Sequence, residues 1–135
     1  MSKSELSDLS RINLTDNKDQ IINKIKKAKT DTLPLPSTIE ELEKRPEAKN
    51  LIGIYSSLMK NTLQKSIDEF SGKNFSDFKE KLSELIVNEI NPISLKVKEL
   101  LNDKVFLEKT LNDGYEKANE IASKKIKKIH EIVGF

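Results

Sequence analysis

The fold is decided by residues 76–90, which read SDFKEKLSELIVNEI. Apolar side chains recur there at intervals of three and four residues, namely Phe78, Leu82, Leu85, Ile86 and Ile90. This spacing places them on the buried face of an amphipathic α-helix. The pattern continues to residue 101 through Ile93, Val97, Leu100 and Leu101. The sequence therefore predicts a long helix over 76–101, kinked at Pro92, whose ring blocks a backbone hydrogen bond to the preceding turn.

A second long helix is predicted over 103–132. Its apolar stripe consists of Leu107, Leu111, Tyr115, Ala118, Ala122, Ile126, Ile129 and Val133. Gly134 follows as a stop signal, and Gly114 weakens the middle of the helix by about 1 kcal/mol relative to alanine. The two long helices are expected to pack antiparallel.

Shorter helices are predicted upstream. Ile21, Ile22, Ile25 and Ala28 recur at helical spacing after the possible N-cap residues 14–16, which predicts a helix over 16–29. Two more are predicted after Pro46 and over 62–70, the latter capped by Thr62 and ended by Gly72. The prolines of residues 30–46 indicate a connector, in which Ser37 and Glu40 have the form of a capping box. The predicted fold is all-α, an irregular bundle of about five helices dominated by the two long ones.

Composition limits the functional classes. The 135 residues suit one domain with a thin core, since 36% are hydrophobic and 34% charged. The net charge is only +2, from 24 basic and 22 acidic residues, so attraction to nucleic acid would need local clustering. The absence of cysteine excludes disulfides and cysteine nucleophiles. No signal peptide or membrane-spanning run is recognisable, so we expect a cytoplasmic protein without a membrane partner.

A catalytic centre formed by this chain alone is not predicted. His130 is the single histidine and has no nucleophile beside it in the sequence, so we interpret it as a surface residue. No glycine-rich phosphate loop is present, and carboxylates such as Glu80 and Glu84 are scattered over helix surfaces. The sequence therefore predicts no metal site.

Lysines cluster in two places. One cluster contains Lys24, Lys26, Lys27 and Lys29, and the other contains Lys124, Lys125, Lys127 and Lys128. Such clusters suit contact with backbone phosphates of RNA. From composition alone they are more typical of the solvated face of an amphipathic helix, and a weaker alternative is a helix lying on a membrane surface.

Several segments, in order and at their separations, resemble a known family over essentially the whole chain. They are Met1-Ser2-Lys3-Ser4, residues 8–14 (DLSRINL), 27–31 (KAKTD), 50–55 (NLIGIY) and 131–135 (EIVGF). The chain thus resembles the C-terminal part of the bacterial tryptophanyl-tRNA synthetases, a family of class I aminoacyl-tRNA synthetases. Residues 1–4 match the last four letters of the family's K-M-S-K-S loop.

The resemblance implies specific roles. Lys3 would stabilise the developing charge on the ATP phosphates, with Ser2 and Ser4 as supporting groups and Mg²⁺ as the metal of the intact enzyme. Residues 1–15 would be a remnant of this loop with an extended segment, and residues 16–135 a helical domain that binds the anticodon arm of the tRNA for tryptophan. Both lysine clusters and Arg11 become candidates for RNA contact, and Arg45, Asn50 and Tyr55 have suitable chemistry, although Tyr55 is more typical of a core.

The resemblance also implies partners. The intact enzyme would be a homodimer that includes an N-terminal nucleotide-binding half, whose histidine-containing ATP signature this chain lacks. The isolated chain is therefore expected to hold no cofactor and to be inactive. Two alternatives stay open, a stand-alone tRNA-binding helical module and a structural helical bundle that pairs with other proteins. Salt-sensitive tRNA affinity would favour the first.

Overall fold

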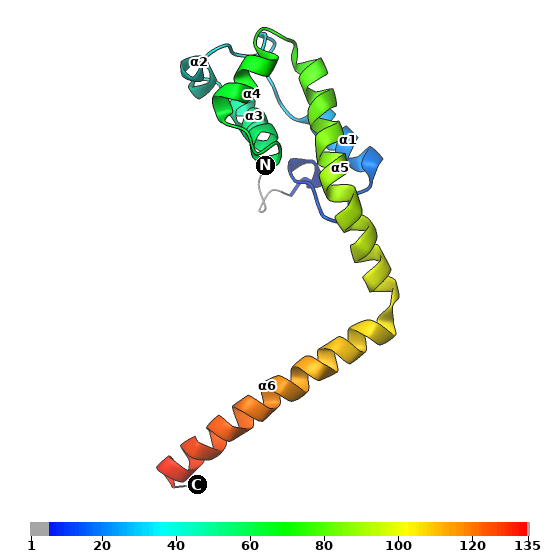
Figure 1. Ribbon diagram of the computed structural model, residues 1–135, viewed down its shortest axis with the longest axis vertical. Coiled ribbons are helices and arrows are strands. Elements are labelled where there is room, and N and C mark those ends of the chain that lie inside the picture. Colours follow the sequence, from blue (N-terminus) through cyan, green and yellow to red (C-terminus); the bar gives the residue numbers. More distant parts are fainter. Residues whose placement is uncertain (1–5, 135) are drawn as a thin grey trace. The chain divides into compact units, whose positions relative to one another are not determined.

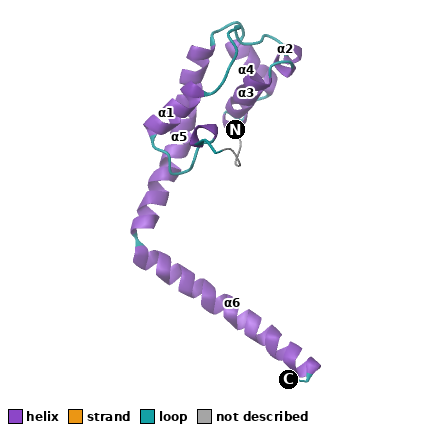
Figure 2. Ribbon diagram, turned by 180° about the vertical axis from the view of Figure 1, so that it is seen from behind, coloured by secondary structure: helices purple, strands orange, loops and turns teal. Residues whose placement is uncertain are grey.

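The computed structural model describes residues 6–134, and within this range all regular structure is helical (Figure 1; Figure 2). A short 3₁₀ helix, η1 (Asp8–Ser10), is followed by six α-helices. These are α1 (Lys18–Lys27), α2 (Ile39–Glu43), α3 (Pro46–Leu58), α4 (Leu63–Phe70), α5 (Phe75–Asn102) and α6 (Lys104–Val133). The all-α prediction and both long helices are confirmed.

The chain divides into two compact units. The first unit ends at Leu95 and contains η1, α1 to α4 and most of α5. The second unit begins at Lys96 and contains the end of α5 and all of α6. The antiparallel packing of the two long helices stays a prediction.

The helix starts follow local capping chemistry. The cap of α1 is Asn17, whose side chain accepts a hydrogen bond from the Gln20 backbone N–H at 2.9 Å while the Gln20 side chain accepts one from Asn17 N–H at 2.8 Å. The predicted start at residue 16 was wrong by two residues, because Asp16 does not cap the helix and its carboxylate accepts a hydrogen bond from Lys24 instead. Pro46 at the start of α3, Thr62 at the start of α4 and Gly72 after α4 act as predicted.

The N-cap of α2 lies one residue later than predicted, and the reciprocal capping box predicted from Ser37 and Glu40 does not form. Thr38, not Ser37, is the N-cap, and its hydroxyl accepts a hydrogen bond from the Glu41 N–H at 3.2 Å. The Glu41 carboxylate accepts one in return from the Ser37 N–H at 2.8 Å. Glu41 and not Glu40 makes this contact because the helix begins at Ile39, which places Glu41 at the third helical position.

The core of the first unit is built around three aromatic rings, one each from α3, α4 and α5. Phe70 packs edge to face on Tyr55 and on Phe78, with ring centroids 4.9 and 4.8 Å apart. Ile21 and Ile25 of α1 belong to the same core. Lys79 of α5 donates a hydrogen bond to the Ala28 carbonyl at 2.6 Å, which satisfies the C-terminal end of α1. Helices α1 and α5 are thus joined where they meet.

The apolar face of α5 is buried over only part of its length. Leu82 and Ile86 are buried, but Ile93 and Leu101 are 45% and 57% exposed, so their predicted burial was wrong. The helix continues across Pro92 without a break, and the predicted kink stays a prediction. In α6 no residue is buried, and the side chains of its apolar stripe are exposed or, at Leu107, half-buried.

None of the helices described between residues 6 and 134 is long and apolar enough to cross a membrane.

Candidate functional site

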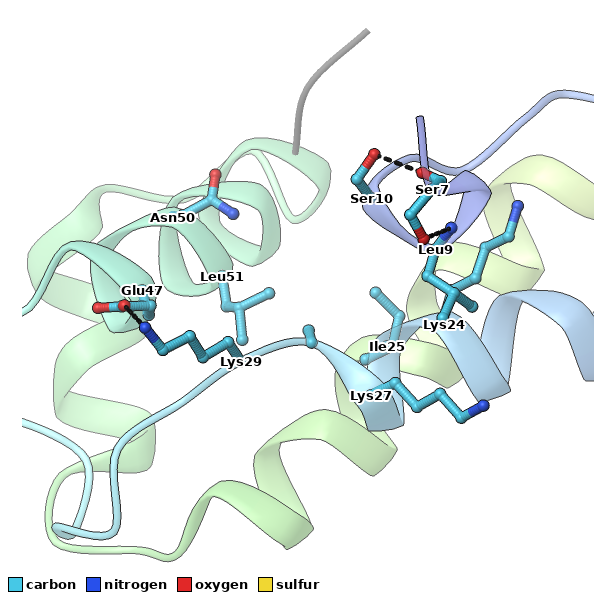
Figure 3. A pocket seen from close by; sticks show the side chains of 11 residues that line it. Ser7, Leu9, Ser10, Lys24, Ile25, Lys27, Lys29, Glu47, Asn50 and Leu51 are labelled. Atoms are coloured by element: carbon cyan, nitrogen blue, oxygen red, sulfur yellow. Dashed lines mark hydrogen bonds and ion pairs between the residues drawn. The ribbon is translucent and has the colours of Figure 1, made fainter. Parts of the chain in front are cut away.

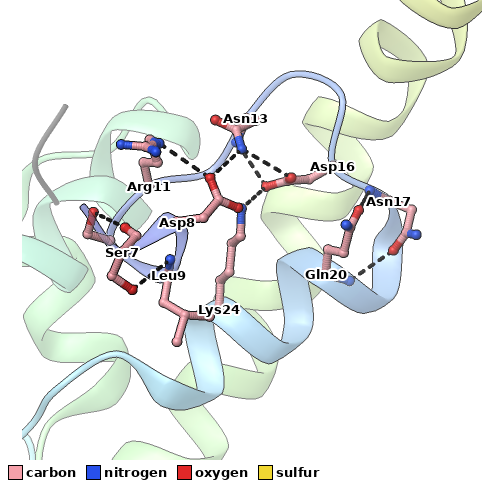
Figure 4. Close-up of polar contacts among 10 residues, drawn as sticks. Ser7, Asp8, Leu9, Arg11, Asn13, Asp16, Asn17, Gln20 and Lys24 are labelled. Carbon is pink, nitrogen blue, oxygen red and sulfur yellow. Dashed lines mark hydrogen bonds and ion pairs between the residues drawn. The ribbon is translucent and has the colours of Figure 1, made fainter. Parts of the chain in front are cut away.

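A polar cluster lies where the segment before α1 meets that helix (Figure 4). We call it the Lys24 cluster, and it consists of Asp8, Arg11, Asn13, Asp16 and Lys24. The Lys24 side chain is only 5% exposed, and its ammonium lies 2.6 Å from an Asp16 carboxylate oxygen and 2.7 Å from one of Asp8. One buried cation therefore holds two carboxylates that are eight residues apart.

Asn13 and Arg11 complete the cluster. The Asn13 side-chain amide donates to Asp8 at 2.9 Å, and its backbone N–H donates to Asp16 at 2.9 Å. The Arg11 guanidinium lies 3.3 Å from the Asp8 carboxylate. Both carboxylates thus receive several donors, as buried or partly buried anions require.

The contacts of the cluster shift the pKa values of Asp8 and Lys24. The hydrogen bond from Lys24, followed by that from Asn13, lowers the pKa of Asp8 to about 2. Burial by itself lowers the pKa of Lys24, but the hydrogen bonds to Asp16 and Asp8 outweigh it and the net shift is upward. The contact between Lys24 and Asp8 therefore favours the charged form of both groups.

A cavity of about 480 Å³ adjoins this cluster, between α3 and the η1–α1 segment (Figure 3). Its apolar lining comes from Leu9, Ile25, Ala28 and Leu51. The polar lining comes from Ser7, Ser10, Lys24, Lys27, Lys29, Glu47 and Asn50. The charges in this lining are largely compensated, because Lys24 is paired with Asp8 and Asp16, and Lys29 is paired with Glu47.

The structure separates the first lysine cluster into two environments. Lys26, Lys27 and Lys29 are exposed, and Lys29 is paired with Glu47 at 3.5 Å. Lys24 is buried, and its contact with RNA stays a prediction that this burial disfavours. Its ammonium forms ion pairs with Asp8 and Asp16. Arg11 is half-buried in the Lys24 cluster.

The second lysine cluster lies on the exposed surface of α6. Lys124 is paired with Glu120 one turn earlier at 2.6 Å, and Lys125, Lys127 and Lys128 are exposed. His130 follows on the same helix and is also exposed, as interpreted from the sequence. The predicted catalytic residue Lys3 and the predicted phosphate-binding residues Ser2 and Ser4 lie outside the described residues.

Two residues with chemistry suited to RNA serve the fold. The Tyr55 ring is buried as expected, and its hydroxyl donates to Glu69 at 3.1 Å. Arg45 forms a two-pronged contact with Asp31, 2.8 and 2.5 Å long, and donates to the Pro34 carbonyl at 2.6 Å. Arg45 therefore ties the proline-containing connector to the start of α3.

The sequence analysis missed the two acidic members of the Lys24 cluster. A signal was available, because Lys24 lies three residues after Ile21 and four before Ala28 and so shares the buried face of α1. A lysine in that position requires an anionic partner. The sequence does not identify which of its 22 acidic residues supplies it.

Comparisons with known proteins agree on one family. The family model described as tRNA synthetases class I (W and Y) matches residues 1–91. A tryptophan-tRNA ligase of Agrobacterium fabrum is 48% identical over 135 residues, which are 100% of this chain and 38% of that protein. The corresponding ligases of Brucella melitensis and Rickettsia felis are 46% and 48% identical, again over the whole chain, which covers 38% and 40% of their lengths. The chain therefore spans about two fifths of the length of the curated relatives it matches.

Proposed function

The chain belongs to the class I tRNA synthetases (W and Y), and from this premise we propose that it is the C-terminal part of a tryptophan-tRNA ligase. The observation that carries the proposal is the similarity of all 135 residues to enzymes of that name, at 48% identity in the Agrobacterium fabrum relative. The complete enzyme would activate tryptophan with ATP and Mg²⁺ and transfer it to its tRNA, as a homodimer in the cytoplasm.

Lys3, flanked by Ser2 and Ser4, would supply the cation that meets the ATP phosphates in this enzyme. A lysine ammonium stabilises the negative charge that develops in a phosphoryl-transfer transition state. Support comes from sequence alone, since residues 1–4 match the end of the K-M-S-K-S loop and the family model begins at residue 1. Residues 1–15 would belong to this catalytic loop and the segment after it.

Residues 16–135 would form the helical domain that contacts tRNA. The candidates are the exposed lysines and Arg11, namely Arg11, Lys26, Lys27, Lys29, Lys124, Lys125, Lys127 and Lys128. Lysines neutralise backbone phosphates without reading bases, so they would add affinity and not tRNA identity.

The enzymatic part of the proposal is tested by restoring the coding sequence upstream of Met1 and measuring tryptophan-dependent ATP-pyrophosphate exchange. We expect activity in the restored protein, a strong loss on Lys3→Ala, and no aminoacylation by the 135-residue chain alone, because the nucleotide-binding half would be missing. A stop codon directly upstream together with a separate complete ligase gene would contradict the proposal and favour a free tRNA-binding module.

The tRNA part is tested by filter binding at several salt concentrations. The logarithm of the affinity falls linearly with the logarithm of the salt concentration, and each lost phosphate contact makes this slope shallower by about 0.7 to 0.9. We expect this shallower slope for Lys127→Gln and Lys128→Gln. The matched control is Lys104→Gln with Lys109→Gln in the first part of α6, where the slope should be unchanged. Equal slopes in all variants would remove the second lysine cluster from the interface.

A further inference from the structure

The segment between the proposed catalytic loop and α1 has few apolar anchors. Leu6, Leu9 and Leu14 are 99%, 45% and 53% exposed. Ile12 is the side chain of residues 6–14 that packs against the core of the first unit. The position of this segment therefore depends mainly on its polar contacts.

Those contacts converge on Lys24. Asp8 lies at the start of the segment and Asp16 at its end, and the Lys24 ammonium is within 2.7 Å of both. Asn13, between them in sequence, donates to each carboxylate at 2.9 Å, from its side chain and its backbone respectively (Figure 4). The segment is thus closed into a loop around one cation that α1 supplies.

We infer that Lys24 is a positioning residue for the ATP-binding loop, because it holds the chain that directly follows that loop. The inference rests on the proposed function of residues 1–4. Lys24 does not touch substrate in this inference. It acts through Asp8 and η1, four residues after Ser4, and so determines where the loop leaves the folded domain.

Stability alone does not account for a lysine at this position. Removing an ammonium and a carboxylate from water is costly, and well-packed apolar residues in place of buried ion pairs often leave a protein equally or more stable. An apolar residue would also continue the spacing of Ile21 and Ala28. Unlike an apolar side chain, the Lys24 ammonium pairs with two particular carboxylates, those of Asp8 and Asp16. These pairs specify the conformation of the segment between them.

The expected effect is on ATP use. Catalytic groups must be held within about 0.5 Å, and displacement by about 1 Å can reduce the rate about 100-fold. In the complete enzyme we expect Lys24→Met to lower kcat/KM for ATP by about 10- to 100-fold. The KM for tryptophan should stay unchanged, because the loop meets the phosphates and not the amino acid.

The experiment is steady-state ATP-pyrophosphate exchange with the complete enzyme, varying ATP and tryptophan separately. The control is Lys18→Met, an exposed lysine on the same helix. Lys24→Arg keeps the positive charge on a larger, planar head group, so it should recover part of the lost kcat/KM for ATP. A merely structural role would reduce the amount of folded enzyme, which lowers kcat for both substrates equally and leaves both KM values unchanged.

A second variant covers the case in which Lys24→Met does not fold. Asp8→Asn removes the more exposed partner, whose side chain is 57% exposed, and keeps the buried Lys24–Asp16 pair. It should fold and raise the KM for ATP several-fold. If the unsubstituted enzyme is active and the folded variants have its KM and kcat/KM for ATP, the inference about Lys24 is wrong but the proposed function stands. An inactive unsubstituted enzyme would overturn the proposed function and the inference together.

Discussion

The helices of the first unit and helix α6 are all amphipathic, but their apolar side chains are buried to different extents. In the first unit Phe70 and Phe78 are 1% and 0% exposed and meet side chains from several helices. In α6 residues of comparable hydrophobicity, such as Leu111 and Ile126, are 72% and 50% exposed. Helical spacing therefore predicts that a helix forms, but burial requires facing elements from elsewhere in the chain. Substitutions in the two regions should have very different effects.

The largest expected difference comes from truncating apolar side chains. Phe78→Ala should destabilise the first unit by about 3–5 kcal/mol, because it leaves a cavity beside Tyr55 and Phe70. Ile126→Ala in α6 should change stability by at most about 0.5 kcal/mol. Urea unfolding followed by tyrosine fluorescence, in a Tyr115→Phe background so that Tyr55 alone reports, measures the first effect. Hydrogen exchange of α6 measures the second. Equal losses in the two regions would show that the apolar stripe of α6 is buried in solution.

Ion pairs provide the next comparison. The Arg45 side chain is 15% exposed and binds Asp31 and two backbone carbonyls, so Arg45→Met should cost about 1.5–3 kcal/mol. Lys124 of α6 is 73% exposed and paired with Glu120 one turn away, and Lys124→Met should cost only about 0.3–0.5 kcal/mol. The same unfolding and exchange measurements apply. A loss of unfolding free energy below about 0.5 kcal/mol for Arg45→Met, as small as for an exposed ion pair, would show that Arg45 does not hold the connector to α3.

Glycine to alanine substitutions should have opposite signs in the two regions. Gly72 has φ +70°, and alanine there should destabilise the first unit by about 1 kcal/mol. Gly114 is inside α6 with open space around the position of an added Cβ, so alanine should stabilise this helix by about 1 kcal/mol. Thermal unfolding of both variants, followed by circular dichroism, gives the signs. A stabilising Gly72→Ala would contradict the left-handed conformation of that residue.

The smallest effect concerns pH and is confined to the first unit. The pKa of Asp8 is about 2, below its ordinary value of 3.8. Because the folded-state pKa is depressed, the stability that Asp8 contributes is present above pH 3.8 and is lost as the pH falls towards 2. An NMR titration of the Asp8 carboxyl carbon should give this midpoint, and Lys24→Met should move it back towards 3.8. A midpoint that Lys24→Met leaves unchanged would show that another group holds the carboxylate.

Local patterns were predicted well where one segment contains the whole signal. Thr62, Pro46 and Gly134 mark helix ends because a cap acts within about four residues. The start of α1 was misplaced because Asp16, a suitable cap by type, is bound to Lys24. The same contact explains why the burial of Lys24 was not predicted, since helical spacing does not say which charged residues from another segment reach a given lysine.

The sequence by itself determined that the chain is helical, where most helices begin and end, and which family it resembles, because these depend on neighbouring residues and on short motifs in order. Tertiary structure alone decided that Lys24 is buried, that Asp8 and Asp16 share its charge, and that the apolar faces of α5 and α6 are covered to different extents. Burial and pairing depend on which segments meet in space, and the free energy of a charge or an apolar surface depends on that environment.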